Sequence, residues 1–304
     1  MTQTLSGALR SRPALGRMAL YVIPDVRWTV NVRGVGPMAV RLRRNRSYWL
    51  RDPLQHEAFM LGTMQRLINP GGVAFDVGAN IGLYVRLMIQ QFAAGRVVAF
   101  EPYTQNLALL RRNVQLGNCQ DRVEIAPIAL ADYEGTDDFQ IDDVSTATGT
   151  LNAVARGGPS EARRQYGLPA ATETVTVASL DSLVESGALP VPHFIKVDIE
   201  GAEELFLRGA CRTLQRHGPN LAIELHGVQS AAAVVRLLLQ IGYPLFGFLD
   251  GRNGVVYKEV VASDIDEITT PYSLHHCAAS RDRALLSAPI DLGLCARLGF
   301  AYDA

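Results

Sequence analysis

The feature that most constrains the fold of this chain is a repeated alternation, from residue 73 onward, of short apolar runs with helical patterns. The first run, Val73–Val77, is followed by a glycine-containing loop and then by apolar residues at helical spacing between Leu83 and Phe92. A second run, Arg96–Phe100, precedes another helical pattern between Leu107 and Val114. Unbroken apolar strands that alternate with helices are typical of a parallel sheet covered on both faces. The sequence therefore predicts an α/β fold with a mostly parallel, doubly wound sheet.

This alternation continues along the chain with one interruption. Val123–Leu130 is expected to form a third strand, and the pattern resumes with strands at His193–Asp198 and Leu221–Leu225. Residues 131–172 between them are rich in Asp, Thr, Gly and Ala and exceed an ordinary connection, so we regard them as an insertion and a candidate lid. Two later runs, Tyr243–Leu249 and Gly254–Val261, are expected to complete the sheet as an antiparallel pair.

The first 70 residues are predicted to form a small cap. Trp28–Arg33 and Met38–Arg43 show apolar alternation on both sides of a glycine turn, which is typical of a β-hairpin. Residues 53–68 have apolar positions at helical spacing, and residues 1–20 are expected to be frayed or weakly helical. We therefore divide the chain into an N-terminal hairpin and helix cap, residues 1–70, and a main domain, residues 71–304.

The composition restricts the partners of the chain. With 29 Lys and Arg against 30 Asp and Glu, the formal net charge is −1, so no global positive field attracts a nucleic acid. No apolar run approaches the roughly 20 residues that a bilayer span requires. The four cysteines show neither zinc-site nor disulfide spacing, which fits a reducing compartment. We expect a cytoplasmic protein with no nucleic acid partner and no membrane span, and the sequence leaves the oligomeric state open.

A glycine loop follows the first predicted strand, where open α/β sheets bind nucleotide-containing ligands. The loop reads Asp76-Val-Gly78-Ala-Asn80-Ile-Gly82. Its glycines permit tight turns and the close approach of a ligand, and the helix that follows offers free N–H groups to an anion. Glu101 ends the second predicted strand, where a carboxylate can accept hydrogen bonds from the hydroxyls of a ribose.

Two classes of cofactor compete for this loop. A dinucleotide site requires G-x-G-x-x-G, but Asn80 stands where the second glycine should be. Asp76 would repel a diphosphate and would attract the ammonium group of a methionine moiety. The loop therefore favours S-adenosylmethionine (SAM) over NAD. Asp76 and Glu101 as mere helix caps would imply neither cofactor, and two acidic strand ends around one glycine loop argue against that interpretation.

A second group of polar residues lies on later strands. Lys196, Asp198 and Glu200 alternate along a strand and its exit, so their side chains point to the same side, and Glu224 and His226 alternate in the same way one strand further. A hydroxyl that attacks a methyl donor must lose its proton to a carboxylate or an imidazole. The candidate catalytic residues are therefore Lys196, Asp198, Glu224 and His226. For His226 a base and a structural histidine are both open, and for Lys196 an ion pair and support of a developing alkoxide are both open.

The same carboxylates raise the option of a divalent metal ion. Asp198, Glu200 and Glu224 would supply the hard oxygen ligands that Mg²⁺ or Ca²⁺ prefers, and an ion would lower the pKa of the acceptor hydroxyl. Because Lys196 can neutralise these carboxylates without an ion, a metal is an option that we do not expect.

Three further histidines were considered. His275 and His276 are adjacent, so on a regular strand they point to opposite faces and form a poor chelating pair. His56 precedes the helix of the cap, where it and Glu57 can line the pocket from the N-terminal side.

Four segments resemble signature segments of the FkbM-type methyltransferases: Phe75–Gly82, Phe100–Pro102, Ser179–Asp181 and Ile195–Glu203. The first two mark only the general methyltransferase fold, whereas the Lys-x-Asp-x-Glu-Gly-x-Glu pattern in the last is specific. The resemblance covers about residues 55 to 227. It implies a Rossmann-like class I methyltransferase fold in which residues 71–304 form the SAM-binding catalytic domain.

The resemblance also implies site residues and an activity. Cofactor contacts are carried over to Asp76, Gly78, Asn80, Gly82 and Glu101, while Asp198 is a further candidate for contact with the methionine end. Family members are mostly O-methyltransferases of sugars, polyketides and other secondary metabolites. We therefore expect methylation of a hydroxyl on a small-molecule acceptor. The alternatives are an NAD-dependent oxidoreductase and a non-catalytic scaffold subunit with a methyltransferase fold.

Overall fold

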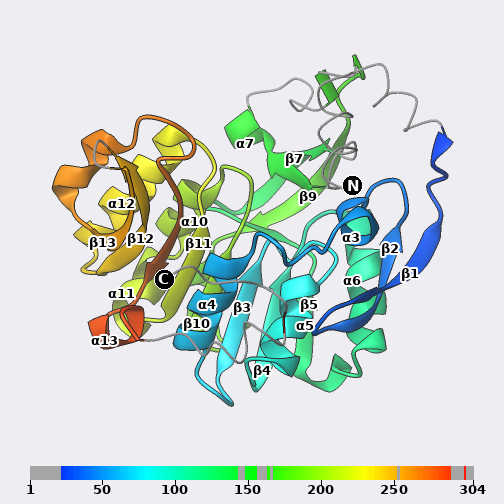
Figure 1. Cartoon of the computed structure of the whole chain (residues 1–304), viewed down its shortest axis with the longest axis horizontal. Helices are drawn as coiled ribbons and strands as arrows, with labels where there is room; N and C mark the ends of the chain where they lie inside the picture. The colour runs from blue at the N-terminus through cyan, green and yellow to red at the C-terminus, as the bar shows by residue number, and fades with distance from the viewer. Residues whose placement is uncertain are drawn as a thin grey trace.

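The computed structural model describes residues 22–142, 148–155, 163–164, 167–251, 254–288 and 298. The predicted frayed segment, residues 1–20, lies outside the described residues. The described strands form a two-stranded, an eight-stranded and a four-stranded sheet. In Figure 1 the four-stranded sheet, in green, lies above the larger sheet, and the blue N-terminal hairpin lies beside α6.

The eight-stranded sheet has the order β13-β12-β14-β11-β10-β3-β4-β5. Five neighbouring strands, from β11 to β5, run parallel, while β14 runs antiparallel to β11 and β12 on either side of it. The predicted mostly parallel sheet is confirmed, and so is the antiparallel pairing of β12 with β13. The sequence did not predict β14. The strands are β3 (Val73–Val77), β4 (Arg96–Phe100), β5 (Val123–Ala126), β10 (Phe194–Val197), β11 (Asn220–Glu224), β12 (Leu245–Gly251), β13 (Gly254–Val260) and β14 (Leu274–Ala279).

Helices cover both faces of this sheet. Ala74 and Ala222 belong to one apolar cluster with α4, α5 and α6, whereas Phe75 and Leu221 belong to a second cluster with the helices from α9 to α12. Because successive strand residues point to opposite faces, each apolar run serves both layers. The helices are α4 (Ala58–Leu67), α5 (Leu83–Gln90), α6 (Thr104–Leu116), α9 (Leu180–Glu185), α10 (Glu203–Gly209), α11 (Cys211–His217), α12 (Val228–Gln240) and α13 (Arg283–Leu286), with 3₁₀ turns η1 (Gln120–Arg122) and η2 (Ala262–Glu267).

The predicted third strand, Val123–Leu130, is wrong as a single element. It divides into β5 and the short strand β6 (Ala129–Leu130), which belong to different sheets. Pro127 stands between them, and proline has no N–H group with which to continue a strand ladder. β5 pairs with β4 in the large sheet, and β6 pairs with β9 in the small one.

The four-stranded sheet has the order β6-β9-β7-β8. The described part of the predicted insertion, residues 131–172, supplies β7 (Gly135–Asp142), β8 (Thr148–Leu151) and the helical turn α7 (Asn152–Ala155), and β9 is Thr172–Ala178. Phe139, Gly149 and Leu151 of this sheet line the cleft described below. The role of the segment as a lid remains a prediction.

The N-terminal cap is a hairpin that packs on the main sheet's helices. β1 (Arg27–Val32) and β2 (Gly36–Arg41) pair antiparallel, as predicted. The side chain of Asn113 in α6 accepts a hydrogen bond from Ala39 N at 2.6 Å and donates one to Ala39 O at 3.0 Å. The buried Arg86 of α5 donates to the carbonyl groups of Val35 and Pro37. The domain boundary at residue 70 remains a prediction.

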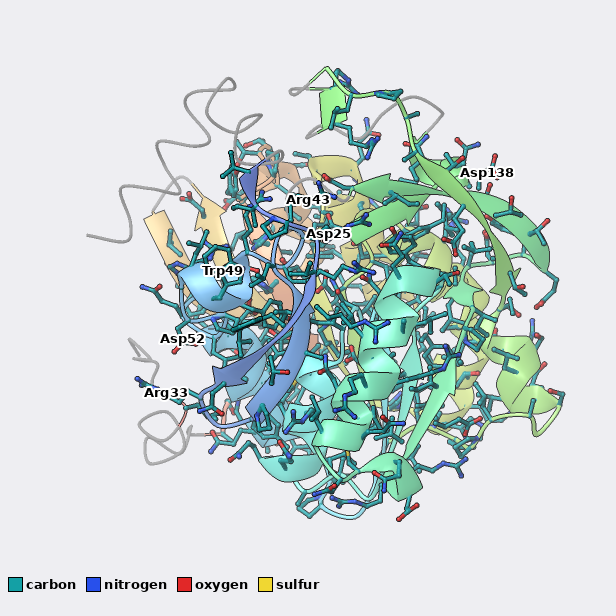
Figure 2. All side chains as sticks on the ribbon, turned by 90° about the vertical axis from the view of Figure 1, so that its right-hand side faces the viewer. Asp25, Arg33, Arg43, Trp49, Asp52 and Asp138 are labelled. Atoms are coloured by element: carbon teal, nitrogen blue, oxygen red, sulfur yellow. The ribbon has the colours of Figure 1, made fainter. Side chains whose placement is uncertain are left out.

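The carboxylate of Asp25 links the segment before the hairpin to the turn after it. One Asp25 oxygen lies 2.8 Å from Arg44 Nε and 3.6 Å from Arg43 Nη2, and Figure 2 shows Asp25 beside Arg43. The turn leads into α3 (Ser47–Leu50) and then α4. Among the described residues, no helix combines the length and the apolar character that crossing a bilayer requires.

Candidate active site

A cleft of about 660 Å³ opens at the carboxyl ends of β3, β4 and β10. The loop after β3 contributes Gly78 and Asn80, the end of β4 contributes Glu101, and Phe139 and Leu151 cover the cleft from the small sheet. The cleft lies where the sequence placed the cofactor loop.

The glycine loop needs left-handed backbone at three positions. Gly78 has φ 84° and Gly82 has φ 89°. A Cβ atom on Gly78 would lie 1.9 Å from the carbonyl oxygen of Asp198, and one on Gly82 would lie 2.6 Å from a methyl carbon of Leu110. Asn80 has φ 48°, and its buried Oδ1 has no hydrogen-bond partner among the described residues. The loop thus packs tightly on β10 while leaving one acceptor atom for a ligand.

Glu101 forms one wall of the cleft. Its two carboxylate oxygens accept hydrogen bonds from Asn80 N and Tyr103 N, each at 2.8 Å. Burial raises the pKa of Glu101 to about 7, although these hydrogen bonds oppose the shift. The backbone of the glycine loop therefore fixes the orientation of this carboxylate.

Asp76 and Lys196 form a buried ion pair. They are direct register partners on β3 and β10, and Lys196 Nζ lies 3.3 Å from Asp76 Oδ1 and 4.6 Å from the centre of the Tyr84 ring. Burial lowers the pKa of Lys196, but the charges of Asp76 and Asp198 outweigh it and raise it overall, so Lys196 stays protonated. Asp76 is not among the described residues that line the cavities. Its direct contact with an ammonium group remains a prediction, and its charge is already balanced by Lys196.

Asp198, the second predicted contact for the methionine end, lines the cleft, whereas Asp76 does not. Its carboxylate accepts a hydrogen bond from Lys196 Nζ at 3.3 Å, and Asp198 lines both the cleft and a neighbouring cavity of about 810 Å³. Arg51, His56 and Glu57 line that cavity from the cap, which confirms the predicted place of His56 and Glu57. The phenol of Tyr84 donates a short hydrogen bond to the Glu57 carboxylate.

Glu200 is held in an uncommon backbone conformation beside the cleft. Its φ is 50°, in the left-handed region that non-glycine residues seldom adopt, and Gly201 follows with φ 97°. Glu200 lines the cleft next to Asp198. Burial raises the pKa of Glu200 to about 7, supported by the charges of Asp198 and Glu224 and opposed by that of His226. The sequence predicts Glu200 as a metal ligand or a partner of Lys196 and assigns it no role as the base.

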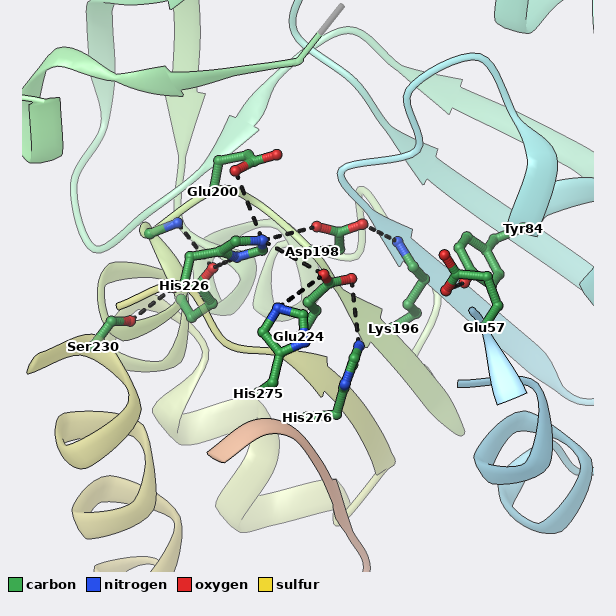
Figure 3. A network of polar contacts seen from close by, with 12 residues as sticks. Glu57, Tyr84, Lys196, Asp198, Glu200, Glu224, His226, Ser230, His275 and His276 are labelled. Atoms are coloured by element: carbon green, nitrogen blue, oxygen red, sulfur yellow. Dashed lines mark hydrogen bonds and ion pairs between the residues drawn. The ribbon is translucent and has the colours of Figure 1, made fainter. Parts of the chain in front are cut away.

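His226 stands at the centre of the acidic residues (Figure 3). Its Nδ1 lies 2.7 Å from Glu203 Oε1, and Ser230 Oγ donates to the other oxygen of Glu203 at 2.7 Å. Burial lowers the pKa of His226, but the hydrogen bond to Glu203 and the charge of Glu200 outweigh it and raise it to about 10. His226 therefore carries a proton at neutral pH, which disfavours the hypothesis that it acts as the base.

The carboxylates predicted to share a metal ion surround this imidazole instead. His226 Nε2 lies 3.9 Å from Asp198, 3.7 Å from Glu200 and 3.7 Å from Glu224. A cationic ring between three carboxylates balances their charge, so this arrangement does not support the predicted set of oxygen ligands. The predicted catalytic residues do meet in space, because the ends of β10 and β11 lie side by side.

The expectation for His275 and His276 is wrong. Between Gly247 and Leu249 β12 advances two residues, whereas β14 advances three, from Cys277 back to Leu274. The additional residue marks a β-bulge, which re-aims side chains and breaks the alternation of a strand. Both imidazoles consequently face Glu224, at 3.5 Å for His275 Nε2 and 3.7 Å for His276 Nε2.

The fold and the cleft together define a class of protein. The fold is a Rossmann-like class I methyltransferase fold, as predicted. It combines a mostly parallel sheet, in which the antiparallel strand β14 lies next to β11, with a tight glycine loop after β3 and a carboxylate at the end of β4. The family model of the methyltransferase FkbM domain matches residues 76–245. The chain belongs to this family, in agreement with the resemblance of its sequence segments.

Three curated relatives are similar to this chain. Hexuronic acid methyltransferase AglP of Haloferax volcanii is 27% identical over 168 residues, covering 55% of this chain and 61% of the relative. AMB antimetabolite synthetase AmbE of Pseudomonas aeruginosa is 26% identical over 196 residues, covering 56% of this chain and 9% of the relative. Methyltransferase 1 of Beauveria bassiana is 26% identical over 176 residues, covering 54% and 69%. The chain thus matches under two thirds of the length of AglP and a small part of AmbE.

Two solved structures are similar to this chain at lower sequence identity. Methyltransferase FkbM from Methylobacillus flagellatus is 18% identical, with a TM-score of 0.44 over 71% of this chain and 47% of that chain. Pyrococcus horikoshii TYW2 in complex with MeSAdo is 11% identical, with a TM-score of 0.43 over 85% and 73%.

Proposed function

We propose that this protein transfers a methyl group from SAM to a hydroxyl oxygen of a small molecule, such as a sugar, a polyketide or another secondary metabolite. The observation that carries the proposal is the placement of two differently suited carboxylates on one cleft, Glu101 at the end of β4 and Glu200 after β10. AglP, a relative at 27% identity, is named a hexuronic acid methyltransferase, which supports a sugar-like acceptor.

The residues of the cleft fit SAM. The buried carboxylate of Glu101 accepts hydrogen bonds from the ribose hydroxyls, and the unpartnered Oδ1 of Asn80 offers a further acceptor. The absence of a side chain at Gly78 allows the close approach of the ligand. Asp198 attracts the ammonium group, and Arg51, in the adjoining cavity, attracts the carboxylate. When bound, SAM supplies an electrophilic methyl group.

Side chains of the protein then remove the proton of the acceptor hydroxyl. Glu200 accepts this proton, because its raised pKa of about 7 lets it be ionised before the reaction and protonated after it. Protonated His226, 3.7 Å from Glu200, and protonated Lys196, 3.3 Å from Asp198, keep these acidic groups apart and oriented. The strained backbone of Glu200 is a further sign of a functional position.

Two other functions remain as outcomes of the test. An NAD-dependent oxidoreductase has no observation in its favour beyond Glu101, which suits any ribose. A non-catalytic scaffold subunit would keep the donor site without turnover. The predicted cytoplasmic location and the predicted lack of a nucleic acid partner stay predictions.

The proposal is tested by binding and then by transfer. Calorimetric titration should detect S-adenosylhomocysteine (SAH) and not NAD, and heat with NAD alone would overturn the proposal. Incubation with methyl-¹³C SAM and a panel of uronic acids, glycosides and hydroxylated metabolites should give a product whose methyl carbon shift is that of an O-methyl group. A methyl group on nitrogen would replace the proposed O-methylation by N-methylation. SAH binding without any product would favour the scaffold function.

A further inference from the structure

Three side chains on two adjacent strands converge outside the donor cleft. Glu224 ends β11, and His275 and His276 stand at the start of β14, the strand that pairs with β11. The two imidazole Nε2 atoms lie 3.5 and 3.7 Å from the two oxygens of the Glu224 carboxylate, and one atom from each residue lies within 4.8 Å of the others. Figure 3 shows both rings directed at this carboxylate.

These separations are longer than direct hydrogen bonds and leave room for a shared ion. Hydrogen bonds between nitrogen and oxygen span about 2.7–3.2 Å. Two ligand atoms bound to one ion at about 2.1 Å with a tetrahedral angle lie about 3.4 Å apart. The observed 3.5 and 3.7 Å are therefore close to the spacing of atoms that share an ion.

The bulge in β14 is the structural reason that two neighbouring histidines can act together. On a regular strand one of them would point away from Glu224. The ring of Phe59 packs on His276 with centroids 5.3 Å apart and holds it in place, while the side chain of His275 is 41% exposed and keeps the site open to solvent. The geometry thus combines one fixed ligand, one accessible ligand and one carboxylate.

We propose that Glu224, His275 and His276 bind a divalent transition-metal ion at the edge of the donor cleft. Two imidazole nitrogens and one carboxylate select ions such as Zn²⁺ or Co²⁺ over Mg²⁺ and Ca²⁺, which prefer oxygen. Three protein ligands leave a position open for another molecule. This ligand set differs from the three carboxylates considered from the sequence and shares only Glu224 with them.

The position relative to the cleft gives the ion a use. His226 Nε2 lies 3.7 Å from Glu224 and 3.9 Å from Asp198, which lines the cleft, so one imidazole separates the ion from the donor site. A hydroxyl oxygen bound in the open position of the ion would become more acidic. This use rests on the proposed function, whereas binding of the ion does not.

The test uses Co²⁺ as a spectroscopic probe on the untagged full chain after EDTA treatment and dialysis. The wild-type protein should bind one Co²⁺ with visible absorption bands, which Zn²⁺ abolishes and excess Mg²⁺ does not. His275→Ala and His276→Ala should each weaken Co²⁺ binding at least about tenfold. His217→Ala, at the exposed end of α11, is the matched control and should bind as the wild type does.

Titration with SAH on the same samples separates the two proposals. Because the His275 side chain is 41% exposed, we expect His275→Ala to fold, and loss of Co²⁺ binding in this variant with retained SAH binding supports the ion site. A wild-type protein that binds SAH but not Co²⁺, or equal Co²⁺ affinity in all four proteins, overturns the ion site and leaves the proposed function standing. Co²⁺ binding without SAH binding supports the ion site and overturns the proposed function.

Discussion

Glu203 holds His226 in place from beneath the acidic cluster. The Glu203 side chain is fully buried, one of its oxygens lies 2.7 Å from His226 Nδ1, and the same oxygen accepts a hydrogen bond from Gly201 N at 2.9 Å. Because three groups form hydrogen bonds with this buried carboxylate, its orientation is fixed, and it in turn orients the imidazole of His226. The strained turn at Glu200 and the end of β11 are thereby joined through one side chain.

Glu203→Gln should lower the pKa of His226 and change how stability depends on pH. The pKa of His226 is about 10 in the folded protein against 6.5 in the unfolded chain, so its contribution is fully present below about pH 6.5 and is lost as the pH rises towards 10. Removing the charged partner should reduce this contribution by about 1–3 kcal/mol. The measurement is the free energy of urea unfolding at about pH 6 and pH 9 in EDTA. Glu204→Gln, on the exposed face of α10, is the control, and an identical pH dependence in both variants would contradict the expectation.

Glu101→Gln should weaken SAH binding and remove its pH dependence. The ionised carboxylate accepts the ribose hydrogen bonds, so wild-type affinity should fall about tenfold from pH 8 to pH 6 if its pKa is about 7. The neutral amide should bind at least about tenfold more weakly at pH 8, with little change on acidification. Isothermal titration checks both values. Glu124→Gln on β5, whose carboxylate pairs with Arg96, should retain the wild-type profile.

Gly78→Ala should destabilise the protein more than a matched glycine change elsewhere. Its Cβ would meet the Asp198 carbonyl oxygen at 1.9 Å, in addition to the strain of φ 84°. Gly71 has φ 76° with no atom within 4 Å of the new Cβ, so Gly71→Ala isolates the backbone strain. We expect a loss of about 1 kcal/mol for Gly71→Ala and at least about 2 kcal/mol more for Gly78→Ala. The free energy of unfolding is measured by heat or urea. Equal losses in the two variants would contradict the expectation and would show that the loop moves away from β10.

Glu200→Gln should separate turnover from donor binding. Loss of the proton acceptor should lower kcat about 10²–10⁴-fold while SAH binds as before. In the wild type, kcat at saturating SAM should rise with pH through about 7, because Glu200 must be ionised, and this limb should vanish in the variant. Glu200→Asp, which keeps the carboxylate, should restore part of the rate and the pH limb. A pH profile unchanged in Glu200→Gln would assign the proton to another group.

The parallel half of the fold was accessible to sequence reasoning because its signal is local. The unbroken apolar runs at Val73–Val77 and Arg96–Phe100 match β3 and β4 residue for residue. The glycine loop and Glu101 were found by the same means, since strand ends and turns impose residue types at fixed spacing. These features make up the proposed donor side of the site.

The remaining features depend on contacts between distant segments. From the sequence, Asp76 is interpreted as a ligand group. In the structure, β10 places Lys196 directly opposite Asp76, and both side chains are buried. From the sequence, the side chains of His275 and His276 are expected to point to opposite faces, because the bulge arises only when β14 pairs with β12. Glu200 lies in the specific Lys-x-Asp-x-Glu-Gly-x-Glu pattern, but its left-handed backbone and its burial beside Asp198 are visible only in the structure. The acceptor side therefore required the assembled sheet.

Because the bulge in β14 turns His275 and His276 toward Glu224, the proposed ion site depends on the number of residues in β14 as well as on their types. Deleting either His275 or His276 would return β14 to strict alternation beside β12, turning the surviving ring to one fixed face. The cleft around Gly78 and Glu101 lies on other strands and would not feel this change. A deletion of one residue in β14 would thus separate the two imidazoles while it leaves the residues of the cleft unchanged.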